Sequence, residues 1–224
     1  MNYAIVIFIT AIISYLLGSC NFSIIVVRLL KGKDIRKFGS GNAGLTNTLR
    51  CFGKIPALLT LAGDLLKGIV SVIICRYIAV LLEAGLGPEN DVHYIGYIAG
   101  VFAIIGHVLP IYYGFKGGKG VLVGVSVFIV IDPPAFAVIM LIFITVLVVS
   151  HYVSVSSMTA AALVPFVTFI IQYFAEKSPL WLAAVNMALT IPMALLVIFM
   201  HRTNMVRLKN GTENRFSFNN NKEK

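Results

Sequence analysis

Residues 180–200 read LWLAAVNMALTIPMALLVIFM and contain no charged side chain. About 20 predominantly apolar residues form a helix long enough to cross the ~30 Å hydrocarbon core of a bilayer. Comparable apolar segments recur along the whole chain, at about 3–27, 56–82, 93–111, 120–131, 134–150 and 155–175. The pattern therefore predicts an all-α polytopic membrane protein with about seven transmembrane helices.

The composition favours one membrane-embedded domain over residues 1–224. The chain is 58 % hydrophobic and only 12 % charged, whereas a soluble domain carries about twice that charged fraction. Its three cysteines show no C-x-x-C spacing and its four histidines are widely separated, so we expect no disulfide framework and no metal site. No Lys or Arg precedes the apolar run from Tyr3 to Leu17, and we interpret this run as a first helix rather than a signal peptide.

The fourth apolar segment is too short to cross the bilayer alone. About 12 residues, from Gly120 to Ile131, span only ~18 Å as a helix, and Asp132-Pro133-Pro134 follows them. Either a loop that dips into the membrane shortens this crossing, or residues 120–150 form a re-entrant pair. We favour two crossings, with the short helix starting inside the bilayer.

The basic residues indicate the orientation. If seven segments cross, the loops 28–54 and 112–119 and the tail 201–224 lie on one side and hold fifteen Lys and Arg. The other side holds Lys177 beside Glu83, Glu89, Asp91, Asp132 and Glu176. Because cytoplasmic loops carry an excess of Lys and Arg, we expect the N-terminus outside and a short basic tail, 201–224, in the cytoplasm. The same basic face suits anionic lipids or phosphorylated substrates.

Three polar motifs lie on this basic side. The first, Gly39–Arg50, reads GSGNAGLTNTLR, and the second, Phe115–Val121, reads FKGGKGV. No strand precedes the first motif, so it is not a dinucleotide fingerprint, and the second lacks the spacing of a Walker A loop. Exposed glycine N–H groups beside basic side chains at the start of a helix still suit an anion. A flexible loop and a glycine-rich turn are the alternatives.

The third motif, His201–Glu213, directly follows the last apolar segment. If the helix continues, His201, Asn204 and Arg207 share one face by their i, i+3 spacing. An imidazole, an amide and a guanidinium on one stripe can act as a base, a hydrogen-bond donor and an anion clamp. A basic stripe next to the membrane is the alternative.

Asp64 and Lys67 are three residues apart inside the second apolar segment. Ionisable groups in a membrane helix usually face a cavity or each other. We expect them either to pair and support the site or to contact the substrate. The histidines His93, His107 and His151 lie at segment edges, and we do not expect them to take part in chemistry.

Together these motifs resemble the signatures of the bacterial membrane acyl-phosphate:glycerol-3-phosphate acyltransferases. The family patterns are G-S-G-N-x-G-x-T-N-x-x-R, K-G-G-K-G and H-R-x-N-x-x-R-L-x-x-G-x-E, and the resemblance covers essentially the whole chain. The departures are slight: Ala43, Leu45 and Asn21 stand where many members carry other small residues or proline. The resemblance implies seven helices, a site on the cytoplasmic side of the bacterial inner membrane, and no requirement for coenzyme A or metal.

The implied reaction moves a fatty acyl group from acyl phosphate to the 1-hydroxyl of glycerol-3-phosphate, which gives lysophosphatidic acid and phosphate. As a hypothesis we assign acyl-phosphate binding to Lys116, Gly117, Gly118, Lys119 and Gly120. We assign glycerol-3-phosphate binding to Ser40, Asn42, Thr46, Asn47, Arg50, Lys119, His201 and Asn204. Within this set, Ser40, Arg50, Lys119, His201 and Asn204 are the candidates for catalysis. Asp64, Lys67, Arg207 and Glu213 are expected to support them.

Membrane lipids are the expected surroundings, no nucleic-acid partner is expected, and the soluble enzyme that supplies acyl phosphate is a candidate partner. A transporter of a phosphorylated anion is the alternative function, because ionisable residues and glycine-broken helices occur in transporters as well. Against it, the polar motifs lie at one face rather than at the midplane, and no internal repeat is apparent.

Overall fold

The computed structural model describes residues 3–82 and 93–216, and these residues form helices and connecting loops without a β-strand. The prediction of an all-α membrane fold is confirmed. The loop that carries Glu83, Glu89 and Asp91 and the end of the basic tail, 217–224, lie outside the described residues. The described helices are α1 Tyr3–Ser19, α2 Phe22–Lys31, α3 Leu45–Phe52, α4 Lys54–Leu81, α5 His93–Val108, α6 Val121–Ile131, α7 Pro133–Ser150, α8 Val153–Ile170, α9 Leu180–Met200 and α10 Arg202–Lys209, with short turns η1 Ile35–Lys37, η3 Ile111–Tyr113 and η4 Ile171–Ala175.

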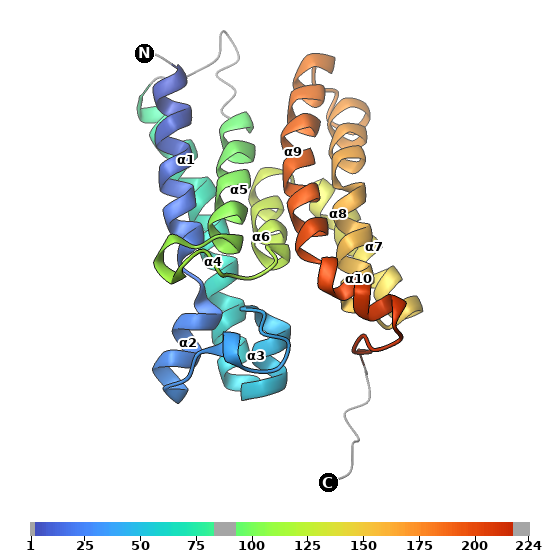
Figure 1. Cartoon of the computed structure of the whole chain (residues 1–224). Helices are drawn as coiled ribbons and strands as arrows, with labels where there is room; N and C mark the ends of the chain where they lie inside the picture. Colours follow the sequence, from blue (N-terminus) through green and yellow to red (C-terminus); the bar gives the residue numbers. More distant parts are fainter. Residues whose placement is uncertain (1–2, 83–92, 217–224) are drawn as a thin grey trace.

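The long apolar helices lie side by side and run alternately in opposite directions (Figure 1). Six described stretches are long and apolar enough to cross a membrane, and α6 is a shorter apolar helix of 11 residues. Helix α1 begins at one end of the molecule, whereas α2, α3 and α10 lie at the other end (Figure 1). All seven expected apolar segments therefore contain a helix, although the fourth is shorter than a spanning helix.

The segment expected as one helix over about 3–27 is divided into α1 and α2. The break falls at Cys20 and Asn21, because the Oδ1 atom of Asn21 accepts a hydrogen bond of 3.1 Å from the N–H of Ile24 and caps α2. The amide of Asn21 also donates to the carbonyl of Ala43 at 3.3 Å. The break therefore ties the end of the first membrane helix to the first motif.

Helix α6 is short for a visible reason at each end. Asp132 ends it and caps α7, because its Oδ1 atom accepts a 2.9 Å hydrogen bond from the N–H of Ala135, and prolines occupy the first turn of α7. The loop before α6, residues 109–120, crosses the molecule at mid-height, above α2 and α3 (Figure 1). This arrangement agrees with a short helix that starts inside the bilayer.

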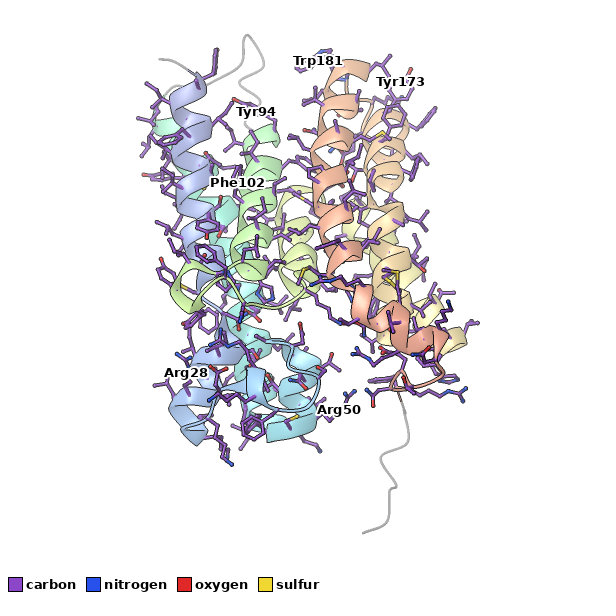
Figure 2. The ribbon with its side chains drawn as sticks, viewed as in Figure 1. Arg28, Arg50, Tyr94, Phe102, Tyr173 and Trp181 are labelled. Atoms are coloured by element: carbon purple, nitrogen blue, oxygen red, sulfur yellow. The ribbon has the colours of Figure 1, made fainter. Side chains whose placement is uncertain are left out.

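The helices form two groups around a shared core. Helices α1, α4, α5 and α6 pack on one another, and α7, α8 and α9 form the second group, which meets the first along α5 and α9. A glycine contact holds α1 close to α5, since a Cβ atom on Gly18 would lie 2.2 Å from the carbonyl oxygen of Ala103. Trp181 and Tyr173 lie at the end of the molecule opposite Arg28 and Arg50 (Figure 2), as expected for aromatic residues at a membrane surface.

Candidate active site

One cavity of about 430 Å³ brings residues of all three motifs together. It lies where the loops of the basic end meet the two helix groups. Its polar lining includes Ser40, Asn42, Gly44, Thr46, Asn47 and Arg50 from the first motif, Lys119 and Gly120 from the second, and His201, Asn204, Arg207 and Glu213 from the third. The sequence prediction that three separate motifs form one site agrees with this cavity.

The first motif is a loop that a single asparagine shapes. The amide nitrogen of Asn47 donates to the carbonyls of Phe38 and Asn42, both at 3.0 Å, and its oxygen accepts the N–H of Ser40 at 3.1 Å. A Cβ atom on Gly39, whose φ is +56°, would lie 2.3 Å from that same oxygen. Asn47 was expected to bind glycerol-3-phosphate, but its side chain is occupied by the loop, so it positions its neighbours instead.

The side chains of Ser40, Thr46 and Arg50 are exposed at the cavity wall, with no hydrogen bond to another residue in the described ranges. Thr46 lies in the first turn of α3, where backbone N–H groups have no partner within the helix, and Arg50 follows one turn later on the same face. Hydroxyls, a guanidinium and a helix N-terminus together favour an anion. This part of the motif is thus suited to a phosphate group.

The second motif is divided between the cavity and the fold. The N–H groups of Gly117 and Gly118 donate to the carbonyls of Val108 and His107, both at 3.1 Å, and so cap the end of α5. A Cβ atom on Gly118 would lie 2.1 Å from the imidazole of His107. These two glycines and the exposed Lys116 are not among the cavity residues, so the expected phosphate cradle of five residues reduces to Lys119, Gly120 and the start of α6.

The loop that precedes Lys119 is held in place by residues that do not line the cavity. The guanidinium of Arg36 donates to the carbonyls of Tyr113 and Lys116 at 2.6 Å and 3.2 Å, and its Nη2 atom lies 2.7 Å from the carboxylate of Asp34. The hydrogen bond from Arg36 holds the pKa of Asp34 well below its ordinary value, despite partial burial. Asp34 therefore stays ionised and keeps Arg36 in position.

Lys119, Asn204 and Glu213 form a chain of hydrogen bonds across the cavity. The ammonium of Lys119 donates to the Oδ1 atom of Asn204, whose amide donates to Glu213 at 2.6 Å. Glu213 also accepts from Arg207 at 2.7 Å and from Ser154 at 2.8 Å. Burial alone would raise the pKa of Glu213, but these three hydrogen bonds lower it, so the carboxylate is ionised.

The pKa of Lys119 is lower than that of an ordinary lysine. Burial, followed by the charge of Arg207, lowers its pKa to about 8, and the charge of Glu213 opposes this change. A phosphate beside the ammonium would favour its charged form. Lys119 is therefore mostly protonated at neutral pH and suited to hold an anion.

His201 sits at the junction of α9 and α10, where the helix expected to continue is interrupted. Its Nδ1 atom lies 2.7 Å from the carbonyl of Val197, so Nδ1 carries the proton and Nε2 keeps a free lone pair. Burial, together with the charge of Lys119, lowers the pKa of His201 to about 4. At neutral pH the Nε2 atom of this imidazole can accept a hydrogen bond from a hydroxyl, but it is a weak base. His201 is therefore better suited to orient a substrate hydroxyl than to take up its proton.

Asp64 and Lys67 pair inside the molecule, as one of the two expectations had it. Their charged atoms are 2.8 Å apart, and the ammonium of Lys67 also contacts the carbonyl of Cys20 and the Nδ1 atom of His107, both at 2.9 Å. Asp64 and His107 line the cavity. The cluster supports two motifs of the site. Cys20 directly precedes Asn21, whose amide holds the first motif, and His107 packs against Gly118 of the second motif.

The sequence analysis did not predict five polar residues of the cavity, His107, Ser154, Ser157, Asn214 and Arg215. His107 was set aside because it lies at the edge of an apolar segment, and only tertiary packing brings it to Lys67 and Gly118. Ser154 was not considered, although it and Ser157 lie three residues apart on α8, where the spacing alone is a weak signal for a polar stripe.

The rest of the cavity is apolar. Side chains of α6, α7, α8 and α9 continue it away from the polar end and form a groove between the two helix groups, with Phe128, Ile139, Val164 and Met193 among them. A cationic pocket joined to an apolar groove matches a compound with a phosphate at one end and a hydrocarbon chain at the other. The fold and cavity thus define a membrane-embedded protein that accommodates phosphorylated amphipathic molecules.

Comparisons with known proteins identify the family. A family model described as glycerol-3-phosphate acyltransferase matches residues 8–211, and the chain therefore belongs to the glycerol-3-phosphate acyltransferase family. It is 39 % identical over 202 residues to a glycerol-3-phosphate acyltransferase of Syntrophomonas wolfei, covering 90 % of this chain and 93 % of the relative. A glycerol-3-phosphate acyltransferase of Halalkalibacterium halodurans is 40 % identical over 203 residues, covering 90 % and 91 %.

Two crystal structures of PlsY, an integral membrane glycerol 3-phosphate acyltransferase, have the same fold. The glycerol 3-phosphate form matches with a TM-score of 0.76 and 31 % identity over 94 % of this chain and 96 % of that one. The lysophosphatidic acid form matches with a TM-score of 0.74 and 29 % identity over 94 % and 95 %. The resemblance read from the three motifs is confirmed.

Proposed function

We propose that this protein transfers a fatty acyl group from acyl phosphate to the 1-hydroxyl of glycerol-3-phosphate, the first acylation step of phospholipid synthesis. The observation that carries the proposal is the single cavity in which a cationic pocket from three motifs continues into an apolar groove. The groove accommodates the acyl chain, and the pocket accommodates the phosphate groups of both substrates. No coenzyme A and no metal are required in this reaction.

The phosphate of glycerol-3-phosphate binds Ser40 and Thr46 near the start of α3 and Arg50 one turn after Thr46, with Asn42 beside them. The exposed, unoccupied side chains of this wall support the assignment. The acyl-phosphate head lies between Lys119 and the start of α6. There Gly120 directly precedes the first turn of α6, and Lys119 supplies a positive charge held by Asn204.

In the chemical step the 1-hydroxyl oxygen attacks the acyl carbonyl carbon. A new ester C–O bond forms, the C–O bond of the mixed anhydride breaks, and its electron pair leaves with phosphate. The Nε2 lone pair of His201 orients the hydroxyl, and the released phosphate takes its proton. The lowered pKa of His201 supports this division of roles, because an acceptor with a pKa of about 4 is a weak base at neutral pH.

We further propose that the basic end faces the cytoplasm of a bacterial inner membrane, with the N-terminus outside. The described Lys and Arg residues outside the helix interiors gather at the end of the molecule that holds the site, and Lys177 is the exception. This orientation gives water-soluble glycerol-3-phosphate access to the cavity. The exposed basic loops are then available to the soluble enzyme that supplies acyl phosphate.

The test is an assay of purified protein in detergent with palmitoyl phosphate and glycerol-3-phosphate, without coenzyme A or metal. Lysophosphatidic acid and phosphate should appear in equal amounts. Arg50→Ala should raise the KM for glycerol-3-phosphate by about tenfold or more, since a charged contact to phosphate is lost. Arg202→Ala is a matched control, because Arg202 is an exposed arginine of the same end that does not line the cavity.

Transport of a phosphorylated anion remains the second candidate. The buried Asp64–Lys67 pair inside α4 supports it, since transporters also use intramembrane charge pairs. Uptake of glycerol-3-phosphate into vesicles without formation of lysophosphatidic acid would favour transport. Product formation in detergent, where no compartment exists, would exclude transport as the sole activity.

A further inference from the structure

The apolar groove follows one face of each helix that borders it. The cavity residues Gly124 and Phe128 of α6 and its N-cap, Gly120, are four residues apart, so they follow one another along one face of the helix. On α9 the corresponding series runs from His201 to Met193. Eight residues of helix are ~12 Å long, and both series end at this same distance from the polar pocket.

A layer of buried polar groups begins beyond that end. Asp132 follows Phe128 by one turn of α6, and Gln172 and Asn186 lie about two turns beyond the last cavity residues of α8 and α9. The amide of Gln172 donates to the hydroxyl of Tyr97 at 2.6 Å and to Asp132 at 3.2 Å, and Asn186 donates to Gln172 at 3.0 Å. These groups take no part in the proposed reaction, yet they connect α5, the junction of α6 and α7, η4 and α9.

Phe128 stands between the groove and this polar layer. Its ring contacts the ring of Tyr97 edge to face, with the centroids 6.3 Å apart, and it is 5 % exposed. The π-helical turn η4 brings Gln172 inward to complete the layer. A hydrocarbon chain that passed Phe128 would separate buried hydrogen-bonding groups from their partners, which is costly in a low-dielectric interior.

We propose that Phe128, supported by the Tyr97–Asp132–Gln172–Asn186 layer, determines acyl-chain length by stopping the terminal methyl of the chain at the end of the groove. This inference rests on the proposed acyl transfer. Shorter chains leave part of the groove unfilled, and longer chains meet the ring of Phe128. Gly124, one turn closer to the phosphate pocket, leaves the groove open at its middle, because it has no side chain.

The test is a chain-length series of acyl phosphates, from decanoyl through dodecanoyl, myristoyl and palmitoyl to stearoyl, with purified protein in detergent. For each variant we compare kcat/KM across the series at saturating glycerol-3-phosphate. Phe128→Ala should raise the ratio of dodecanoyl to decanoyl phosphate about tenfold, the gain expected when about two more methylenes are buried. The KM for glycerol-3-phosphate should change less than twofold.

Gly124→Leu should move the preference in the opposite direction by a similar factor. There is space for the first atom of this side chain, since a Cβ atom at Gly124 would meet only the Cδ1 atom of Ile104, at 3.6 Å. The matched control is Phe166→Ala, because Phe166 lies on α8 with its ring 55 % exposed and does not line the cavity. Its chain-length profile should equal that of the wild type.

If both groove variants keep the wild-type profile, the inference is wrong and the acyl chain leaves the groove before Phe128. If Phe128→Ala does not fold, Gly124→Leu decides alone, since a profile unchanged by that substitution also overturns the inference. Absence of lysophosphatidic acid with every acyl phosphate and the wild-type protein would instead refute the proposed function. The two failures are therefore distinguishable.

Discussion

Replacement of Glu213 by glutamine tests the electrostatics of the cavity directly. Glu213 lies at the centre of the hydrogen bonds from Asn204, Arg207 and Ser154, and its negative charge favours the protonated form of Lys119. Glutamine has almost the same shape, but it removes the charge. The ammonium of Lys119 then faces Arg207 without compensation, so its pKa falls below the present value of about 8.

The magnitude follows from the distances. Lys119 contacts Asn204 and Asn204 contacts Glu213, so the two charges are separated by one amide group. Across such a gap, in a partly buried site, the interaction is of the order of 1–2 kcal/mol, and 1.36 kcal/mol corresponds to one pH unit. In the wild type with a pKa of about 8, about one tenth of Lys119 is protonated at pH 9. The loss of activity should therefore begin about one pH unit lower in Glu213→Gln.

The assay is kcat/KM for palmitoyl phosphate at saturating glycerol-3-phosphate between pH 6 and pH 9.5, because this parameter reports ionisations of the enzyme before acyl phosphate binds. Wild type should fall about tenfold per pH unit above about pH 8, and the variant should fall from about pH 7. Glu176→Gln, three residues after Tyr173 at the far end of the molecule (Figure 2), is the control and should keep the wild-type profile. A basic limb that is absent in the wild type, or unmoved in Glu213→Gln, would refute the role given to Lys119.

Three other results are expected. Gly118→Ala should lower the melting temperature, with a loss of about 1–3 kcal/mol of stability, because the new Cβ atom meets His107; an unchanged melting temperature would contradict this. Lys67→Met should cost about 3–5 kcal/mol by leaving the carboxylate of Asp64 buried without its cation, and the double variant with Asp64→Asn should recover much of that loss in the same thermal unfolding measurement. Wild-type kcat should show no acid limb between pH 5.5 and pH 7, since His201 protonates only near pH 4, and a limb at pH 6.5 that disappears in His201→Gln would show that this histidine has an ordinary pKa.

The sequence predicted the helices well because lipid imposes a simple rule. Backbone polar groups in hydrocarbon must be satisfied within a helix, so an apolar run of sufficient length has few alternatives. The division at Cys20 and Asn21 escaped the prediction, because one polar residue in an apolar run gives a weak signal. Its capping role depends on the local backbone turn.

The site could be predicted in outline but not in detail. Residues near the ends of helices on one face of the membrane were expected to meet, and those of the three motifs do line one cavity. Which glycine N–H groups remain available depends on where α5 ends, and no local pattern encodes that: Gly117 and Gly118 are engaged with its carbonyls. The same holds for His107, whose partner Lys67 lies 40 residues away in the chain.

The short helix α6 also affects the lipid around the protein. Its 11 residues are ~16 Å long, whereas the 28 residues of α4 are ~42 Å long, so the apolar surface is lower where α6 exposes Ile129 than along α4. Bilayers respond to such hydrophobic mismatch by thinning locally. The head group of a newly formed product beside α6 would then lie close to the surface of the neighbouring leaflet. We therefore expect product release to depend on membrane thickness, so that turnover differs between thin and thick bilayers even though the chemistry is the same.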